Sequence, residues 1–97
     1  MPEMTFSVRW PDGGLMRCYS PSLVVQEHLT VGSTYPVGDL VAATRTALGI
    51  ASDRVQARFG FPCSRARAQI TAIEQTARRF GADELTTVEE FAVEEST

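Results

Sequence analysis

The chain has 97 residues, of which 43% are apolar, so we expect one globular domain over residues 1–97 with an acidic tail at 94–97 that frays. No apolar run is long enough to cross a bilayer, and Met1-Pro2-Glu3 lacks the basic start of a signal peptide, which predicts a cytoplasmic protein with no membrane partner. Cys18 and Cys63 lack C-x-x-C spacing, which excludes a zinc knuckle or a thioredoxin-type pair. Metal-ligand spacing, phosphate-binding glycine loops and nucleophile-elbow patterns are also missing from the sequence, so we expect no metal and no cofactor.

The net charge of −3 hides a strong segregation of charge along the chain. Residues 45–79 contain seven arginines and two acids, whereas residues 80–97 contain six acids and no basic residue. A basic middle can bind nucleic acid, but an acidic end can also neutralise it within the fold or in a dimer. We favour neutralisation, because a nucleic-acid binder gains most from an uncompensated positive field.

The first elements predict a β-hairpin. Apolar and polar residues alternate over Met4–Trp10, and the Pro11-Asp12-Gly13 run that follows is typical of a hairpin turn. This turn predicts the pairs Trp10–Gly14, Val8–Met16 and Phe6–Cys18. One face of the hairpin then carries the apolar side chains of Met4, Phe6, Val8, Trp10, Met16 and Cys18. In this register Cys18 is a core residue and not a nucleophile.

The segment after the hairpin is ambiguous. Leu23–Leu29 contains Val24-Val25, which suits a strand, but it follows Ser20-Pro21-Ser22, which suits the start of a helix. We expect a short helical or irregular crossing. The only histidine, His28, lies near its end, where a surface role is the commoner interpretation and a catalytic role the alternative.

Two helices are predicted next. Apolar residues recur at helical spacing over Val37–Leu48, and Gly49 is predicted to close this helix. Ser52 then serves as the N-cap of a short second helix that reaches Phe59. Arg54 and Arg58, four residues apart, share one face of it, which indicates an acidic partner or solvent at that face.

The stretch Phe59–Ser64 is predicted to join two helices. Gly60 suits the left-handed conformation that ends a helix, and Phe61 suits the apolar contact that folds back on such a cap. Pro62 prevents simple continuation of the helix.

The thiol of Cys63 has two interpretations. Either Cys63 or Ser64 caps the next helix, and a thiol at a helix start is near unpaired N–H groups that favour the thiolate. Alternatively, Cys63 is a small apolar residue buried under the joint, which is the interpretation that we favour.

A third helix over Arg65–Phe80 carries an apolar stripe, and Thr86–Val93 alternates as a strand that adds to the hairpin as an edge, with Phe91 and Val93 inward. The predicted fold class is therefore α+β. The N-terminal hairpin and the C-terminal third strand form a small, mostly antiparallel sheet, covered by three to four helices.

The chain resembles a small bacterial family of nitrogen-starvation response proteins. The resemblance spans residue 1 to about Val93 and is carried by Arg9-Trp10-Pro11-Asp12-Gly13, Cys18-Tyr19-Ser20-Pro21-Ser22-Leu23-Val24-Val25, Tyr35-Pro36, Ala47-Leu48-Gly49-Ile50-Ala51-Ser52 with Arg54-Val55, and Phe59-Gly60-Phe61 with Cys63-Ser64. It implies a gene cluster with a nitrilase, linked to nitrile or cyanide assimilation. The cluster also encodes a radical-SAM protein, an acetyltransferase-like protein, an aminoimidazole-ribotide-synthase-like protein and a flavoprotein. No catalytic residue is implied.

Three functions remain open. The favoured one is a non-catalytic accessory or assembly protein that binds another product of its cluster, with homodimerisation through the sheet edge or the arginine-rich helices as an option. The alternative is a small thiol-dependent enzyme or redox-responsive carrier using Cys63, with His28 as its base. The least favoured is a nucleic-acid-binding regulator. The candidate partner-binding residues are Arg54, Arg58, Arg65 and Arg67.

Overall fold

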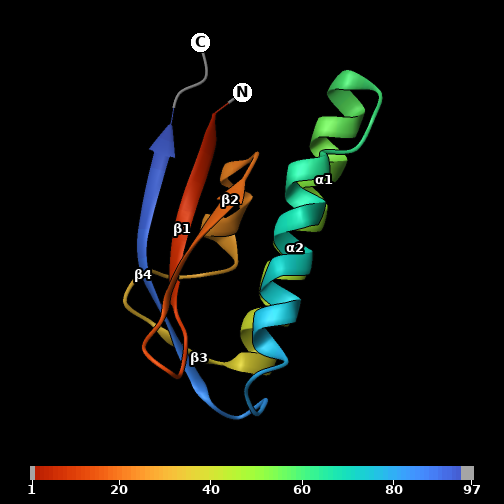
Figure 1. Cartoon of the computed structure of the whole chain (residues 1–97). Coiled ribbons are helices and arrows are strands. Elements are labelled where there is room, and N and C mark those ends of the chain that lie inside the picture. Colours follow the sequence, from red (N-terminus) through yellow and green to blue (C-terminus); the bar gives the residue numbers. More distant parts are fainter. Residues whose placement is uncertain (1, 95–97) are drawn as a thin grey trace.

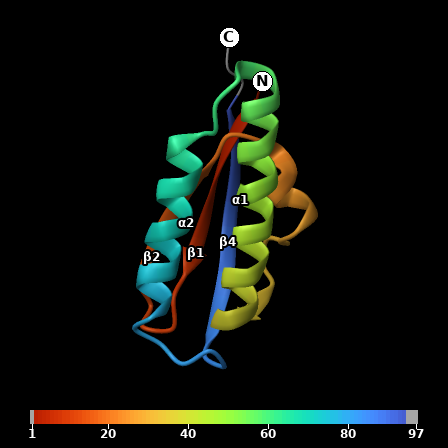
Figure 2. The ribbon, with the colours of Figure 1, turned by 90° about the vertical axis from the view of Figure 1, so that its right-hand side faces the viewer.

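The structure, a computed structural model, describes residues 2–94 and consists of a four-stranded antiparallel sheet in the order β2-β1-β4-β3 with two α-helices. The elements are β1 (Glu3–Arg9), β2 (Leu15–Ser20), a 3₁₀ helix η1 (Leu23–Glu27), β3 (Thr34–Pro36), α1 (Val37–Phe59), α2 (Ser64–Ala77) and β4 (Leu85–Glu94). Figure 1 shows the strands on one side and the helices on the other, and Figure 2 shows α1 and α2 side by side over one face of the sheet. Within residues 2–94, no helix is long and apolar enough to span a membrane.

The predicted hairpin register is confirmed. Phe6 pairs with Cys18 and Val8 pairs with Met16, and the Trp10 N–H donates to the Gly14 carbonyl at 2.8 Å. Gly13 has a φ of +86°, which glycine adopts without the steric cost that a Cβ would bring. The inward side chains of β1 and β2 are buried under the helices, so the alternation in sequence places one face of the hairpin in the core.

The prediction of two helices before the joint is wrong, because α1 runs unbroken through Gly49 for 23 residues. Its buried stripe continues past that glycine, from Leu48 through Ala51 and Ser52 to Val55. A glycine inside a helix costs about 1 kcal/mol, which burial of one large apolar side chain exceeds. Tertiary packing therefore overrides the local stop signal.

The strand arrangement also differs from the prediction of a hairpin plus one edge strand. β4 pairs with β1 but lies inside the sheet, because β3 pairs with its other side at Thr34–Thr87, Tyr35–Thr86 and Pro36–Leu85. The strand β3 was not predicted, since three residues are too few to show alternation. With two α-helices and one short 3₁₀ helix, the fold is α+β, but the predicted three to four helices are not found in residues 2–94.

An extra residue bends β4 near its middle. Ser7 pairs with Glu90 and Val8 with Val88, so β4 places one more residue than β1 between these pairs, which is a β-bulge. The bulge lets Val88 and Phe91, three residues apart, both face the helices. Phe91 is half-buried as part of the core, whereas Val93, predicted to be inward, is 47% exposed.

The helix α2 is shorter than predicted. It ends at Ala77, and Phe80 lies in the following loop, where its ring stacks on Trp10 with 5.9 Å between the ring centroids. Of the tail expected to fray, Glu94 is the last residue of β4, and residues 95–97 lie outside the described part of the chain.

Candidate functional site

The joint between α1 and α2 forms as a tight helix end. Gly60 has a φ of +88°, and its N–H donates to the Gln56 carbonyl at 2.8 Å, which confirms the predicted left-handed cap. The joint lies at the upper end of the helical layer in Figure 1, at the same end of the molecule as the arrowhead of β4. The turn therefore holds residues 61–63 at one end of the domain.

Two phenylalanines of the joint face solvent. Phe59 is 56% exposed and Phe61 is 64% exposed, so the prediction that Phe61 folds back on the helix is wrong. The physical reason lies in the last turn of α1, where residues 56–58 are all exposed and Ala57 is the one small apolar side chain among them for the ring to cover. Two large aromatic rings two residues apart are thus exposed to solvent, with the Arg58 guanidinium near one of them.

Cys63 is the N-cap residue of α2 but does not cap it through its side chain. The residue is half-buried, and its backbone N–H donates to the hydroxyl of Ser52 at 3.2 Å. Ser52 is thus not the N-cap that its type predicted: it lies inside α1, almost fully buried, and ties the joint back onto the helix. The thiol is neither deeply buried nor freely exposed.

The predicted partner of that thiol, His28, lies at the end of η1. Its backbone N–H donates to the Val25 carbonyl at 3.0 Å. Among the described residues, no hydrogen bond connects the His28 side chain with Cys63. Within residues 2–94 the structure thus shows no hydrogen bond of the kind that a cysteine–histidine pair would use in nucleophilic catalysis.

Two of the four candidate arginines lie on the second half of α1 and two on the first turn of α2. Arg54 donates to the Ser22 hydroxyl at 2.9 Å, the Arg58 guanidinium lies 5.8 Å from the centroid of the Phe59 ring, and Arg65 lies 3.7 Å from that of Tyr19. Arg67 is exposed on the first turn of α2. None of the four forms a salt bridge within residues 2–94.

The expected neutralisation of the basic middle by the acidic end is not found in the described chain. The salt bridges are Arg9–Glu89, Arg45–Glu74 and Arg79–Asp12, so only the first uses an acid from the C-terminal segment, and its arginine belongs to β1. The positive charge at the joint is therefore left for solvent or for a partner.

Tyr19 connects α2 to the sheet. Its hydroxyl donates to the Glu3 carboxylate at 3.0 Å, its backbone N–H donates to Gln69 of α2 at 2.9 Å, and Arg65 covers its ring. Partial burial, followed by the hydrogen bond to Glu3, raises the pKa of Tyr19 to about 12. These contacts fix the start of α2, and with it the joint, against the edge strand β2.

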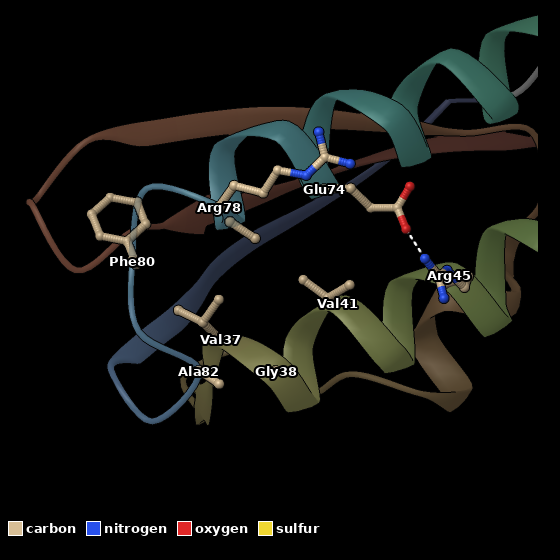
Figure 3. Close-up of a pocket in the computed structure, with 9 residues that line it drawn as sticks. Val37, Gly38, Val41, Arg45, Glu74, Arg78, Phe80 and Ala82 are labelled. Carbon is tan, nitrogen blue, oxygen red and sulfur yellow. Dashed lines mark hydrogen bonds and ion pairs between the residues drawn. The ribbon is translucent and has the colours of Figure 1, made fainter.

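A groove of about 350 Å³ lies at the other end of the helices (Figure 3). It is lined by Val37, Gly38, Val41, Arg45, Glu74, Ala77, Arg78, Phe80 and Ala82. Arg45 of α1 and Glu74 of α2 form an ion pair across it, so much of its charge is already satisfied. Its titratable side chains are two arginines and one glutamate, which provide no nucleophile.

The sequence predicts the joint but not which of its side chains face solvent. The Phe-Gly-Phe run predicts a cap with its own apolar contact, but Gln56 and Arg58 before it are polar, which indicates that the rings have little to cover. Likewise, Arg65 and Tyr19 are 46 positions apart, so no local pattern in the sequence predicts the contact between them. The described residues contain no cluster of three or more ligand side chains suited to a metal ion.

Comparison with known proteins identifies a family and no structural relative. The family model described as nitrogen starvation-induced protein NitG matches residues 5–93. Neither the curated proteins nor the solved structures gave a match.

Proposed function

Because the chain belongs to this family of nitrogen starvation-induced proteins, we propose that it acts in the cytoplasm of nitrogen-starved cells by binding another protein through the α1–α2 joint, without catalysis of its own. The observation that supports this function is the pair of exposed rings, Phe59 and Phe61, beside arginines without acidic partners in residues 2–94. Aromatic and arginine side chains are the residue types that contribute most binding energy at protein interfaces.

The chemistry of the joint specifies the partner surface. The rings require an apolar pocket, and the guanidinium groups of Arg58 and Arg67 favour carboxylates, which arginine binds through two parallel hydrogen bonds. The partner surface is therefore acidic around an apolar centre. The resemblance to proteins encoded beside a nitrilase makes the products of such a cluster the first partners to test.

The test is co-purification from nitrogen-starved cells with the tagged chain and a double variant, Phe59→Ser with Phe61→Ser. We expect the wild-type chain to recover a cluster product and the double variant to lose at least about tenfold in recovery, which corresponds to about 1.4 kcal/mol. The matched control is Leu15→Ser with Leu85→Ser, which removes two apolar side chains of similar exposure, 56% and 58%, outside the joint. Equal recovery by the two double variants, or no cluster product with the wild type, would overturn the proposal.

The second candidate function uses the Cys63 thiol. It is supported by the position of this half-buried residue at the start of α2, a position at which reactive cysteines occur in proteins. Alkylation of the native protein across pH measures this directly. An unreactive Cys63, or unchanged growth on the nitrogen source with Cys63→Ala, would eliminate the thiol function and leave protein binding.

A further inference from the structure

We propose that the outer edge of β4 between Glu90 and Glu94 binds an extended basic segment of a partner protein, which adds to the sheet as a further strand. This inference concerns a surface separate from the α1–α2 joint and does not depend on the function proposed for it. Strand addition of this kind takes its affinity from backbone hydrogen bonds and its specificity from alternate side chains.

The edge is open because β3 covers only the first part of β4. β3 pairs with Leu85–Thr87, and the loop before β3 makes two further hydrogen bonds with Val88. The Gly32 N–H donates to the Val88 carbonyl at 2.7 Å, and the Val88 N–H donates to the Ser33 carbonyl at 3.1 Å. Beyond Val88, no strand of residues 2–94 pairs with this side of β4. In Figure 1, β3 lies near the lower end of β4, away from the arrowhead.

The alternation of hydrogen bonds identifies the free groups. The hydrogen bond from the Trp10 N–H to the Gly14 carbonyl shows that Trp10 directs its backbone groups toward β2. Alternate residues of a strand direct these groups to the same side, so Val8 and Phe6 also direct theirs toward β2. The residues opposite Phe6 and Met4 on the other side are Phe91 and Val93, which therefore direct their N–H and C=O groups away from β1. Ala92, opposite Thr5, bonds to β1. Phe91 and Val93 thus present their backbone groups to a new strand.

The side chains beside this edge define the chemistry of the new strand. Glu90 and Glu94 lie on the face without helices, are exposed, and form no salt bridge among the described residues. Phe91 and Val93 lie on the helical face, where each is only partly covered. A strand that alternates basic and apolar residues matches both faces, because cross-strand neighbours of opposite charge stabilise pairing.

A second copy of this chain fits the edge poorly. Antiparallel pairing of two β4 strands about Ala92 places Glu90 of one copy opposite Glu94 of the other. Like charges directly opposite each other destabilise a strand pair. In this register the acidic edge disfavours self-association, whereas a basic partner strand is favoured.

The first experiment measures amide hydrogen exchange of the free protein. Phe91 and Val93 should exchange fast, and Ala92, which bonds to β1, should be protected. A short synthetic peptide of alternating lysine and valine should then slow exchange at Phe91 and Val93. Protection of these two amides in the free protein, or no change with peptide, would overturn the proposal.

A proline variant separates strand pairing from charge attraction. Val93→Pro removes one outward N–H without breaking a bond to β1, so the variant should fold and bind the peptide about tenfold more weakly than the matched control Val93→Ala. Ala92→Pro should instead destabilise the fold, since its N–H is bonded. The same peptide with proline in place of valine keeps the charge but should not bind.

Three outcomes would contradict the edge site. These are equal binding of the peptide by Val93→Pro and Val93→Ala, binding of the proline-containing peptide, and dimerisation of the free chain that Val93→Pro abolishes. None of them bears on the joint, because Phe59 and Phe61 are unchanged in every one of these variants.

Discussion

The two cysteines of the chain lie in opposite surroundings. Cys18 is fully buried between the sheet and the helices, and burial raises the pKa of its thiol to about 12. Cys63 is half-buried at a joint where Phe59 and Phe61 both face solvent. In the core, apolar side chains stabilise the fold by their burial, whereas at the joint the same kind of side chain is left exposed. Exposed rings gain nothing for folding, so a binding role explains them better than a structural one.

The largest expected effect separates the core from the joint by stability. Leu48 is fully buried, so Leu48→Ala should lower the free energy of unfolding by about 2–5 kcal/mol. Phe61 is mostly exposed, and Phe61→Ala should change it by less than about 0.5 kcal/mol. Urea denaturation of both variants measures the contrast. A loss of several kcal/mol in Phe61→Ala would mean that the ring is buried in solution.

The second prediction uses pH to distinguish the two thiols. The pKa of Cys18 is raised from 9.0 to about 12, so the folded state holds the proton more tightly than the unfolded chain and stability falls as pH rises between these values. The expected slope is about 1 kcal/mol per pH unit. Denaturation between pH 9 and pH 10 should show this slope, and Tyr19, whose pKa is raised from 10.0 to about 12, adds a slope of the same sign as the pH approaches 10.

The variants for this experiment are the two cysteine-to-alanine substitutions. Cys18→Ala should flatten the alkaline slope, whereas Cys63→Ala should retain it. If both variants retain the slope, the Cys18 thiol is not its source.

The smallest expected effects come from two glycines of α1 and its cap. Gly49 lies inside the helix, where an added methyl group would point into open space, so Gly49→Ala should stabilise the protein by up to about 1 kcal/mol. Gly60 has a φ of +88°, so Gly60→Ala should destabilise it by about 1 kcal/mol. Thermal unfolding of the two variants should therefore shift in opposite directions. Destabilisation by Gly49→Ala would contradict a continuous helix.

Local patterns in the sequence predicted those parts of the fold whose causes are local. Alternation over Met4–Trp10 with the Pro11-Asp12-Gly13 turn predicted the hairpin register, and Gly60 predicted the end of α1. Gly49 carried the same local signal as Gly60, but the buried stripe that continues beyond it decides the outcome. A glycine ends a helix only where packing does not require the helix to continue.

The rest depended on contacts between distant segments. The exposure of Val93 follows from how far the helices reach over β4, and the covering of Tyr19 by Arg65 follows from where α2 begins. The sequence predicted Cys63 near a helix start, which is correct, but nothing in the chain near His28 indicated whether its side chain would bond to that thiol. Pairing of side chains across the fold is what single-sequence patterns do not contain.

The bulge in β4 has a consequence for insertions and deletions. Between the pairs Val8–Val88 and Ser7–Glu90, β4 carries one residue more than β1. Deleting Glu89 would restore strict alternation, because Val88 and Phe91 would then be two residues apart and would still share a face. The deletion would also remove the Arg9–Glu89 ion pair. Deleting a residue from the regular part of the strand, such as Ala92, would instead move Val93 to the face without helices and Glu94 to the helical face. Members of this family that differ in length within β4 should therefore differ at the bulge.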